Sequence, residues 1–521
     1  MKPRPHLLFS LLLVFLCLRP DLRAGMARGS SEDTAIVERA HDSVPSAPRR
    51  PAPNVLMIII DDLNDWVSPL GGHPFAETPN LDRLASEGVT FTNAHCPAPL
   101  CNPSRTAVML GLRPDTTGIY ALKPWFRTVP ALASRTSLPQ AFRQAGYTTA
   151  STGKVYHGVY TAEQAQAAEF DLWGPAPGVG VKPPEKIIPP TPNGNHPLMD
   201  WGAFPHADSD HGDYKITTWA LEEMRSLSDN GPFFLCVGYA LPHVPLYVTP
   251  ERLARVPDCE AVLPPILKDD REDTPRFSWY LHWSVPEPRL SWLRSHDQWR
   301  PLCRAYLAAT TFVDEQIGRL LDGLEALGLR EDTWVVLWSD NGYHLGEKGI
   351  SGKNTLWTHS TRVPFIISGP GIAAGRKCEE PVGLIDIFPT LADLTPIQAP
   401  TDLDGVSLLP QLLKPETPRD RPAITTANPS NFSLCDRRWR YIRYADGSEE
   451  LYDRASDPRE WHNLAASDAS QAILAAFRAA LPTTSAPPAP GSARRLLTYD
   501  PQTDTATWEQ QTIINRTTPI P

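Results

Sequence analysis

The stretch Asn54-Val-Leu-Met-Ile-Ile-Ile-Asp-Asp62 (NVLMIIIDD) decides the fold class of this 521-residue chain. Its apolar run from Val55 to Ile60 lacks the polar alternation of a half-exposed strand, so it predicts a central parallel strand buried on both faces. Two aspartates follow directly. We therefore expect an α/β sheet whose strand ends carry the polar residues that do the chemistry.

Helical and strand-like segments alternate after this strand. Thr78 as N-cap, Pro79 at the first helical position and Gly88 as C-cap predict one helix. The same signals at Ser137 and Gly146 predict another. Further strands are expected at 147–152, 231–240, 333–339 and 362–371, and a long amphipathic helix at 306–327. This order predicts an α/β fold with a large, mostly parallel sheet sandwiched between helices.

Changes in composition divide the rest of the chain. The main domain is predicted to cover residues 53–400. Within it, residues 260–300 carry four tryptophans and many prolines, which indicates an insertion or lid. Residues 401–481 predict a smaller C-terminal α+β subdomain, with a hairpin at Asp446-Gly447 and a helix from 470 to 481. Residues 482–521 form a Pro-rich and then polar tail with little structural signal.

The N-terminus has the form of a signal peptide, predicted for residues 1–24. A short basic region precedes the apolar run from Leu7 to Leu18, and residues 25–52 resemble a flexible lead-in. No later stretch approaches the ~20 apolar residues of a spanning helix. We therefore expect an exported protein, periplasmic or secreted (or in a lysosomal-type compartment of a eukaryote), without stable membrane insertion. The net charge of -10 argues against a nucleic-acid partner.

The chain has eight cysteines, of which Cys17 lies in the predicted signal. The remaining seven are an odd number, which in an oxidising compartment indicates one cysteine with a separate role. Disulfides among the other six remain open. Cys101, in CNPSR, has four interpretations: a disulfide half, a buried apolar residue, a thiol nucleophile or a modified residue. Its local sequence alone favours the buried apolar residue.

Polar residues follow several of the predicted strands. Asp61 and Asp62 follow the first, and Asp340 and Asn341 follow the strand at 333–339. Four hard oxygen donors suit Ca²⁺ or Mg²⁺ better than zinc, and adjacent carboxylates repel one another without a cation between them. The sequence therefore predicts a metal site at this edge. Other loop residues after strands, individually weak candidates, are Lys154, His157, His243 and Lys353.

Together with these residues, Cys101-Asn-Pro-Ser-Arg105 resembles the Cys-x-Pro-Ser-Arg modification motif of the type I sulfatases, in the alkaline phosphatase superfamily. The resemblance spans roughly residues 52–470 and includes IIIDDLNDW, RPDTTGIY, TGKVYH, ALPHVP and SDNGYHLGEKG. Among sulfatases it is similar to the iduronate-2-sulfatase group. The chain departs from the sulfatase motif at Leu110, usually threonine. It departs from the iduronate-2-sulfatase group at Leu241, usually lysine, and at Asn341, usually histidine.

This resemblance implies that Cys101 is oxidised to formylglycine (3-oxoalanine) by a formylglycine-generating enzyme during export, while the chain is unfolded. It implies a Ca²⁺ site, with Mg²⁺ as the other candidate, in which residue 101 joins four side chains: Asp61, Asp62, Asp340 and Asn341. If conversion of Cys101 is incomplete, the departure at Leu110, in the distal half of the modification motif, would be the expected cause.

The resemblance also implies the catalytic roles of a sulfuric ester hydrolase. Arg105 would stabilise the hydrated aldehyde and the metal site, while Lys154 and Lys353 would bind sulfate. One hydroxyl of the hydrate would attack sulfur, and His157 would deprotonate the other so that sulfate is expelled. His243 would protonate the leaving alcohol.

The expected substrate is a sulfated carbohydrate, such as a sulfated uronic acid of a polysaccharide. Candidate substrate-binding residues are Tyr120, Lys123, Trp125, Arg127 and His344. One alternative is a phosphodiesterase or phosphonate hydrolase of the same superfamily. Another is a non-catalytic carbohydrate-binding relative, which would be expected to have lost some of the catalytic side chains that this chain retains.

Overall fold

The structure is a computed structural model that describes residues 52–158, 168–515 and 517–520. The predicted signal peptide, 1–24, and the lead-in except Ala52 lie outside the described residues. In the part of the chain that is described, no helix has both the length and the apolar content needed to cross a lipid bilayer.

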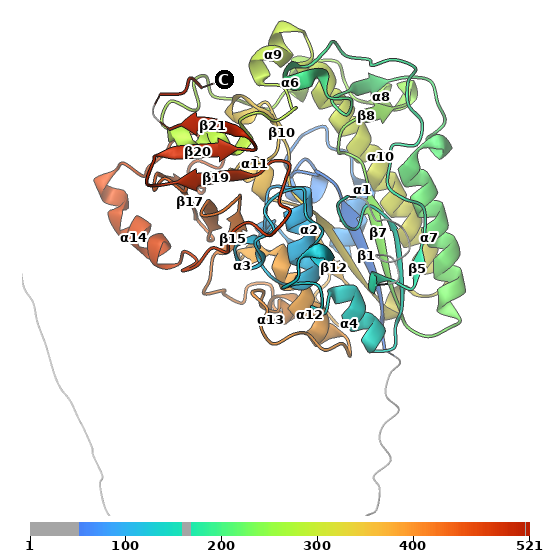
Figure 1. Ribbon diagram of the computed structural model, residues 1–521. Coiled ribbons are helices and arrows are strands. Elements are labelled where there is room, and N and C mark those ends of the chain that lie inside the picture. Colours follow the sequence, from blue (N-terminus) through green and yellow to red (C-terminus); the bar gives the residue numbers. More distant parts are fainter. Residues whose placement is uncertain (1–51, 159–167, 516, 521) are drawn as a thin grey trace, which may run out of the picture. The chain divides into compact units, whose positions relative to one another are not determined.

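An eight-stranded sheet forms the centre of the fold (Figure 1). In spatial order its strands are β13 (Arg376–Cys378), β2 (Gly88–Phe91), β12 (Phe365–Ser368), β9 (Thr333–Ser339), β1 (Asn54–Ile60), β7 (Phe233–Tyr239), β4 (Thr148–Gly153) and β5 (Leu172–Trp173). β12 runs antiparallel to both β9 and β2, and the other neighbours are parallel. The predicted mostly parallel sheet is confirmed, with one reversed strand.

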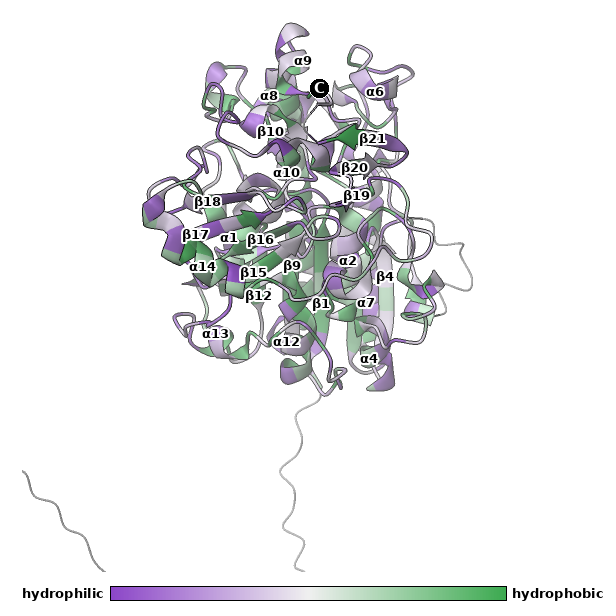
Figure 2. Cartoon of the chain, turned by 60° about the vertical axis from the view of Figure 1, so that its left-hand side comes forward, coloured by the Kyte–Doolittle hydropathy of each residue, from purple (hydrophilic) through white to green (hydrophobic). Residues whose placement is uncertain are grey.

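Strand β1 is buried on both faces, as its unbroken apolar sequence predicts. Leu56, Ile58 and Ile60 pack in one hydrophobic core with α1 (Pro79–Ser86), α7 (Gly212–Ser228) and α10 (Trp299–Ala326). The alternate residues, Val55, Met57 and Ile59, pack in a second core with α2 (Cys101–Leu110), α4 (Leu138–Gln144) and α12 (Ile387–Leu394). The green colour of β1 and β9 in Figure 2 marks this hydrophobic centre.

The predicted helix signals are present in part. Ser137 and Gln140 form a reciprocal capping box at the start of α4, and Gly146 has a φ of 86° just after its end. Thr78 is the N-cap residue of α1, followed by Pro79 as predicted, but its hydroxyl donates to Ser68 Oγ and makes no capping hydrogen bond. Gly88 is not the C-cap, because it begins β2. The predicted long helix is α10, which begins at Trp299. The shorter helices are α3 (Pro114–Thr117), α6 (Pro192–Asn195), α8 (Pro250–Arg255), α9 (Leu290–Ser295), α11 (Thr358–Thr361) and α13 (Leu409–Leu413).

Short strand pairs lie outside the central sheet. β3 (Ala94–His95) pairs with β14 (Val382–Gly383), and β6 (Trp201–Ala203) pairs with β8 (Leu246–Val248). β10 (His344–Leu345) and β11 (Ser351–Gly352) form a small antiparallel hairpin. This last hairpin connects the end of β9 to Lys353, so it shapes one side of the site described below.

The C-terminal part contains two antiparallel sheets. The first consists of β15 (Ala423–Thr426), β16 (Phe432–Cys435), β17 (Trp439–Arg443) and β18 (Glu449–Asp453), and α14 (Gln471–Ala479) packs on it. The hairpin expected at Asp446-Gly447 joins β17 to β18. The second consists of β19 (Leu497–Asp500), β20 (Thr505–Trp508) and β21 (Gln511–Ile514). This sheet lies in the tail, whose amino-acid sequence carries little structural signal.

Residues of the 260–300 segment share a core with the tail sheet. Phe277 and Tyr280 pack in one cluster with Leu497, Trp508 and Ile513. The segment predicted as an insertion or lid therefore anchors the tail. All seven cysteines of the described chain are free, so none of the disulfides that the sequence left open is formed.

Candidate active site

The ends of β1 and β9 lie side by side and bring four polar residues together. Ile60 pairs with Ser339 in the parallel register, so the residues that follow each strand emerge at the same edge. Asp62 has a left-handed backbone (φ 61°), and its N–H donates to Asp340 Oδ1 at 3.1 Å. Asn341 Nδ2 donates to Asp62 Oδ1 at 2.8 Å. The sheet thus assembles Asp61, Asp62, Asp340 and Asn341.

This group of residues fits a divalent cation. Asp61, Asp62 and Asp340 each place a carboxylate oxygen within 4.8 Å of the others. Asp62 Oδ2 and Asn341 Oδ1 are buried and have no hydrogen-bond partner, an arrangement that costs free energy unless another group satisfies them. Carboxylate and amide oxygens are the ligands that Ca²⁺ and Mg²⁺ prefer. The unpaired oxygens therefore indicate a cation site.

Charge repulsion supports the same conclusion. Burial raises the pKa of Asp340 to about 6, and Asp61 and Asp62 add to this effect although Arg105 opposes it. Burial also acts to raise the pKa of Asp61, but the positive charges of Lys154 and Arg105 outweigh it, so that its pKa lies well below the usual value. A cation among these carboxylates would relieve the repulsion at Asp340.

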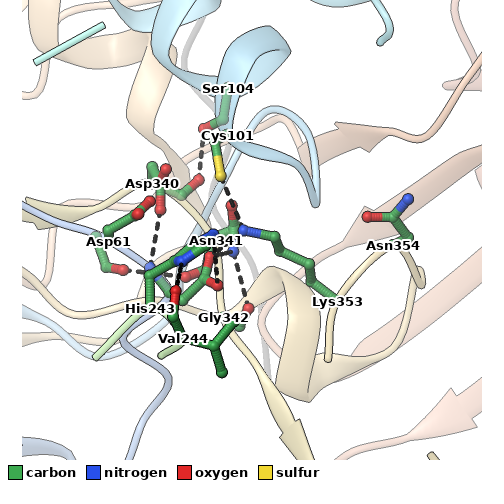
Figure 3. Close-up of polar contacts among 12 residues, drawn as sticks. Asp61, Cys101, Ser104, His243, Val244, Asp340, Asn341, Gly342, Lys353 and Asn354 are labelled. Atoms are coloured by element: carbon green, nitrogen blue, oxygen red, sulfur yellow. Dashed lines mark hydrogen bonds and ion pairs between the residues drawn. The ribbon is translucent and has the colours of Figure 1, made fainter. Parts of the chain in front are cut away.

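Cys101 is the first residue of α2 and is buried beside this cluster. Its Sγ lies 2.8 Å from Lys353 Nζ (Figure 3). Lys154 Nζ lies 3.8 Å from the same sulfur. Burial and the charge of Asp61 raise the pKa of Cys101 to about 12, despite the two lysines. The thiolate is the nucleophilic form of cysteine, so an unmodified Cys101 would be a weak nucleophile near neutral pH.

Arg105 lies one turn after Cys101 in α2, and its side chain binds residues that follow three different strands. Its Nε donates to Asp340 Oδ2 at 2.7 Å and its Nη2 to Asp61 Oδ1 at 3.1 Å. Its Nη1 donates to the carbonyl of Lys154, which follows β4. The side chain is fully buried, so removing this arginine would leave buried carboxylates without their partner, a strongly destabilising change.

The two predicted histidines face the same cluster in their neutral form. His243 Nδ1 lies 2.6 Å from the carbonyl of Val244, which assigns the ring proton to Nδ1 and leaves Nε2 3.9 Å from Asp62 Oδ2. Burial and Lys154 lower the pKa of His243 to about 4. The same two causes lower the pKa of His157 well below its usual value, and its Nδ1 has no hydrogen-bond partner.

The predicted substrate-binding residues are not part of this cluster. In the described structure, none of the five side chains forms a hydrogen bond or an ion pair with Cys101, the acidic residues or the two lysines. Tyr120 is buried and its hydroxyl donates to the carbonyl of Ala486 at 2.7 Å. His344 is also buried, with Nε2 2.8 Å from Thr355 Oγ1. Both side chains are held inside the protein.

Arg127, Lys123 and Trp125 lie on the segment after α3. Arg127 pairs with the buried Glu169 at 2.6 Å and donates to two backbone carbonyls, so its charge is already neutralised. Lys123 is exposed, and Trp125 is partly exposed. Arg127 therefore already has a carboxylate partner in Glu169, and its role in substrate binding stays a prediction.

Sequence analysis missed a polar group beside Lys353. Arg495, which precedes β19, donates to Asn354 Oδ1 at 3.1 Å and pairs with Glu287 at 2.8 Å. Burial acts to lower the pKa of Arg495, but Glu287, Cys101 and Asp62 raise it, so Arg495 lies within the field of the site. Asn354 and Arg495 are 141 residues apart in sequence. Nothing in the tail sequence around Arg495 indicates this contact.

The fold and the site define the class of protein. The nucleophile position lies between two buried lysines, and a cation site lies next to it at the ends of parallel strands. This arrangement suits the transfer of an anionic group from an ester. These are the features of a hydrolase of the alkaline phosphatase superfamily. The model of the sulfatase family matches residues 53–397, and that of the N-sulphoglucosamine sulphohydrolase C-terminal region matches residues 346–486. The chain therefore belongs to the sulfatase family, whose members hydrolyse sulfate esters.

Individual relatives agree with this assignment. A sulfatase of Formosa agariphila is 39% identical over 447 residues, covering 83% of this chain and 87% of the relative. Iduronate 2-sulfatase of Mus musculus is 29% identical, covering 76% of this chain and 74% of the relative. The phosphonate monoester hydrolase of Silicibacter pomeroyi has a TM-score of 0.67 at 23% identity, covering 82% of this chain and 94% of that chain, which shows a shared fold.

Proposed function

We propose that this sulfatase removes sulfate from a sulfated carbohydrate, with Cys101 converted to formylglycine. In this proposal Ca²⁺ is held by Asp61, Asp62, Asp340 and Asn341, and Mg²⁺ is the other cation that these donors suit. The observation that carries the proposal is the position of Cys101 Sγ, 2.8 Å from Lys353 Nζ and beside the acidic cluster.

The high pKa of Cys101 favours modification over thiol catalysis. A buried thiol with a pKa of about 12 holds its proton, whereas catalysis needs a strong nucleophile at this position. Cys101 Sγ stands where an oxygen of the hydrated formylglycine would lie. That hydrate would supply one hydroxyl for attack on sulfur and a second hydroxyl through which sulfate is released.

Lys154 and Lys353 supply the positive charge that a sulfate ester needs. Burial acts to lower the pKa of Lys353, but Asp62 and the other acids raise it well above its usual value. Lys154 likewise has a raised pKa, because Asp61 outweighs burial. Both side chains stay protonated, so they can bind sulfate oxygens and stabilise the charge that develops on them.

His243 and His157 suit the two proton transfers. The Nδ1–H of His243 is held by the carbonyl of Val244, so Nε2 is directed toward the cluster. An anionic ester beside it would raise its pKa and favour proton donation to the leaving alcohol. His157 is neutral, and its unpaired Nδ1 suits acceptance of a proton from a hydroxyl on residue 101.

The carbohydrate substrate is supported by relatives and by the site. The name of the mouse relative gives iduronate, a sugar acid, as the compound it desulfates. Beside Lys353, the polar group of Asn354, Arg495 and Glu287 offers hydrogen-bond donors and acceptors of the kind that sugars use. A sulfated uronic acid of a polysaccharide is the substrate class that these observations favour.

The test is sulfate release from a panel of defined sulfated oligosaccharides, 4-nitrophenyl sulfate and a phosphodiester, with Cys101→Ala as the inactive control. We expect release from saccharides and reaction of position 101 with an aldehyde-specific hydrazide in protein from the natural host. A clear preference for the phosphodiester would assign the chain to phosphodiester or phosphonate hydrolysis. Active protein that contains only unmodified cysteine at position 101 would overturn the formylglycine proposal.

We also propose that the protein is exported, to the periplasm or outside the cell, as its predicted signal peptide suggests. A polysaccharide substrate would be met there, and an unfolded chain would be available to a formylglycine-generating enzyme on the way. N-terminal sequencing of the mature protein should show cleavage near residue 24. An intact N-terminus in cytosolic protein would contradict export.

A further inference from the structure

A cavity lies apart from the cluster of charged residues around Cys101, at the tip of the β10–β11 hairpin. Its volume is about 900 Å³, in the range of small-molecule binding sites. In Figure 1, α9 lies above β10 at the top of the view, and Arg294 of α9 lines the cavity. The other lining residues used below are Arg271, Trp279, Arg289, Lys348 and Gly349. None of them has a role in the proposed reaction.

Two guanidinium groups converge on one imidazole at the wall of this cavity. Arg271 Nη1 lies 3.0 Å from His282 Nε2, and Arg289 Nη1 contacts His282 Nδ1. A neutral imidazole accepts a hydrogen bond at one nitrogen only, and a protonated one at none. In addition, Arg271 Nε is buried without a hydrogen-bond partner. The cluster therefore has more donors than acceptors.

In the part of the chain that the structure describes, these cations have no carboxylate within ion-pair distance. Among the described residues, Arg271, Arg289 and Arg294 form hydrogen bonds or stack on tryptophan rings but make no ion pair. Three acids line the cavity: Asp269, Asp270 and Glu272. Asp270 pairs with Lys348 at 2.7 Å and Asp269 with Lys268 at 3.8 Å, while Glu287, near Arg289, pairs with Arg495 at 2.8 Å. Glu450 acts to raise the pKa of Arg271 without forming an ion pair with it. Burial lowers the pKa of Arg271 to about 9 and that of Arg289 to about 10. Burying a cation without a counter-ion costs free energy that a bound anion would offset.

The cavity is close to the nucleophile position. Gly349 lines it, and Lys353, which contacts Cys101, lies only four residues further along the hairpin. Because consecutive Cα atoms are about 3.8 Å apart, the Cα atoms of Gly349 and Lys353 are at most about 15 Å apart. Arg289 also pairs with Ile350 through a β-bridge, which fixes it beside this hairpin. A short oligosaccharide can span such a separation.

We propose that this cavity binds an oxyanion, a sulfate or a carboxylate, on a sugar residue of the same saccharide that the active site desulfates. The assignment of this oxyanion to a saccharide rests on the proposed function. The surplus of donors on Arg271 and Arg289 would be satisfied by the oxyanion, and Arg294 lies exposed at the entrance. Free inorganic sulfate offers the same oxyanion chemistry, but it would leave most of the cavity unfilled.

The experiment measures binding by calorimetry in the full chain carrying Cys101→Ala, so that no turnover is needed. The probes are a heparin tetrasaccharide, which carries both sulfate and carboxylate groups, and inorganic sulfate. Arg294→Gln removes the exposed charge, and Arg289→Gln/Arg294→Gln removes two charges. Arg225→Gln, an exposed arginine of α7, is the matched control. The thermal midpoint of each variant checks that it has folded.

We expect Arg294→Gln to weaken tetrasaccharide binding about threefold and the double variant at least tenfold, with Arg225→Gln within twofold. Binding should also weaken as salt is added. Tetrasaccharide binding that is absent, or unchanged in Arg294→Gln, overturns the proposal. Sulfate binding that depends on Arg289 and Arg294 without matching saccharide binding assigns the cavity to the free ion and also overturns it.

Failure of the proposed function is recognised separately. If the unmutated enzyme releases no sulfate from any saccharide while the arginine variants still weaken tetrasaccharide binding, the proposed substrate is wrong and the cavity assignment stands as saccharide binding. If sulfate is released but the variants bind like their parent, only the cavity assignment fails.

Discussion

Lys353 Nζ lies 2.8 Å from Cys101 Sγ and also contacts the carboxylate of Asp62, so one ammonium group links the nucleophile position to the cation site. Removing this charge should impair both sulfate binding and charge stabilisation in the transition state. We expect Lys353→Met to lower kcat/KM for 4-nitrophenyl sulfate by about 10²-fold or more. Lys377→Met, on the exposed part of β13, should remain within twofold of the unmutated enzyme. Near-normal activity in Lys353→Met would contradict this role.

Chelation should abolish activity, because the unpaired oxygens of Asp62 and Asn341 indicate a cation ligand set. We expect EDTA to remove activity and lower the thermal midpoint, since loss of a ligand that binds only the folded state lowers stability. Added Ca²⁺ should restore both. Asn341→Leu, of similar size, should need at least tenfold more Ca²⁺ for half-maximal activity. Full activity after exhaustive chelation would argue against a cation requirement.

Arg495 should contribute to substrate turnover although it belongs to the C-terminal tail. Its guanidinium holds Asn354, the neighbour of Lys353, and pairs with Glu287. Because a hydrogen bond to a charged group contributes about 1.5–3 kcal/mol, Arg495→Met should lower kcat/KM for a sulfated saccharide about tenfold or more. The adjacent Arg494 is exposed, so Arg494→Met serves as the control. Equal kinetics of the two variants would show that Arg495 is not a part of the site.

Gly238 should be required for the position of Lys154. A Cβ built on Gly238 would lie 2.2 Å from the carbonyl carbon and oxygen of Lys154, so a side chain here must displace that residue. We expect Gly238→Ala to lower kcat and the thermal midpoint together. Gly178→Ala, where a Cβ meets no atom within 4 Å, should leave both unchanged. Normal kinetics in Gly238→Ala would mean that β4 and β7 adjust without moving Lys154.

Asp213 should make stability depend on pH. Its buried carboxylate accepts hydrogen bonds from the N–H groups of Ala240 and Leu241, just before His243, and burial raises its pKa to about 7. The folded state therefore keeps a proton that the unfolded chain loses near pH 3.8, so this contribution to stability falls as the pH rises toward 7.

Between pH 5 and 7 the loss is about 2 kcal/mol. Asp213→Asn cannot lose a proton. The thermal midpoint of the unmutated protein relative to that of Asp213→Asn should therefore be higher at pH 5 than at pH 8. A difference that stays constant across this range would mean that Asp213 is ionised throughout.

Sequence predicted the parts of the fold that depend on local pattern. The unbroken apolar run of β1 and the capping residues of α4 carry their own signals, because burial on two faces and helix capping each require particular residue types. The sequence does not indicate that β12 runs in the reverse direction, because a short buried strand has the same apolar pattern whether it is parallel or antiparallel to its neighbours. The tail strands were missed because they are short, partly polar and preceded by prolines.

The candidate site was predictable where its residues follow strands. Asp61 and Asp340 emerge at one edge because parallel strands align their ends, and Cys101 was found through its motif. The pairing of Arg127 with Glu169 was not predicted, because the two residues are 42 positions apart and no short-range pattern indicates that ion pair. Arg495 was missed for the same reason, since its contact with Asn354 spans most of the C-terminal part.

The contact between Cys101 and Lys353 joins residues 252 positions apart, which sets a time interval during synthesis. At a chain growth of 5–20 residues per second, Lys353 is made about 13–50 s after Cys101. Until then, the segment that carries Lys353 does not exist, so the contact that closes this side of Cys101 cannot form. Afterwards, α2 closes against Asp340 and Lys353, and access ends. For the proposed conversion of Cys101, this interval would be the time in which a modifying enzyme can act on a growing chain before Lys353 is present to bury the thiol.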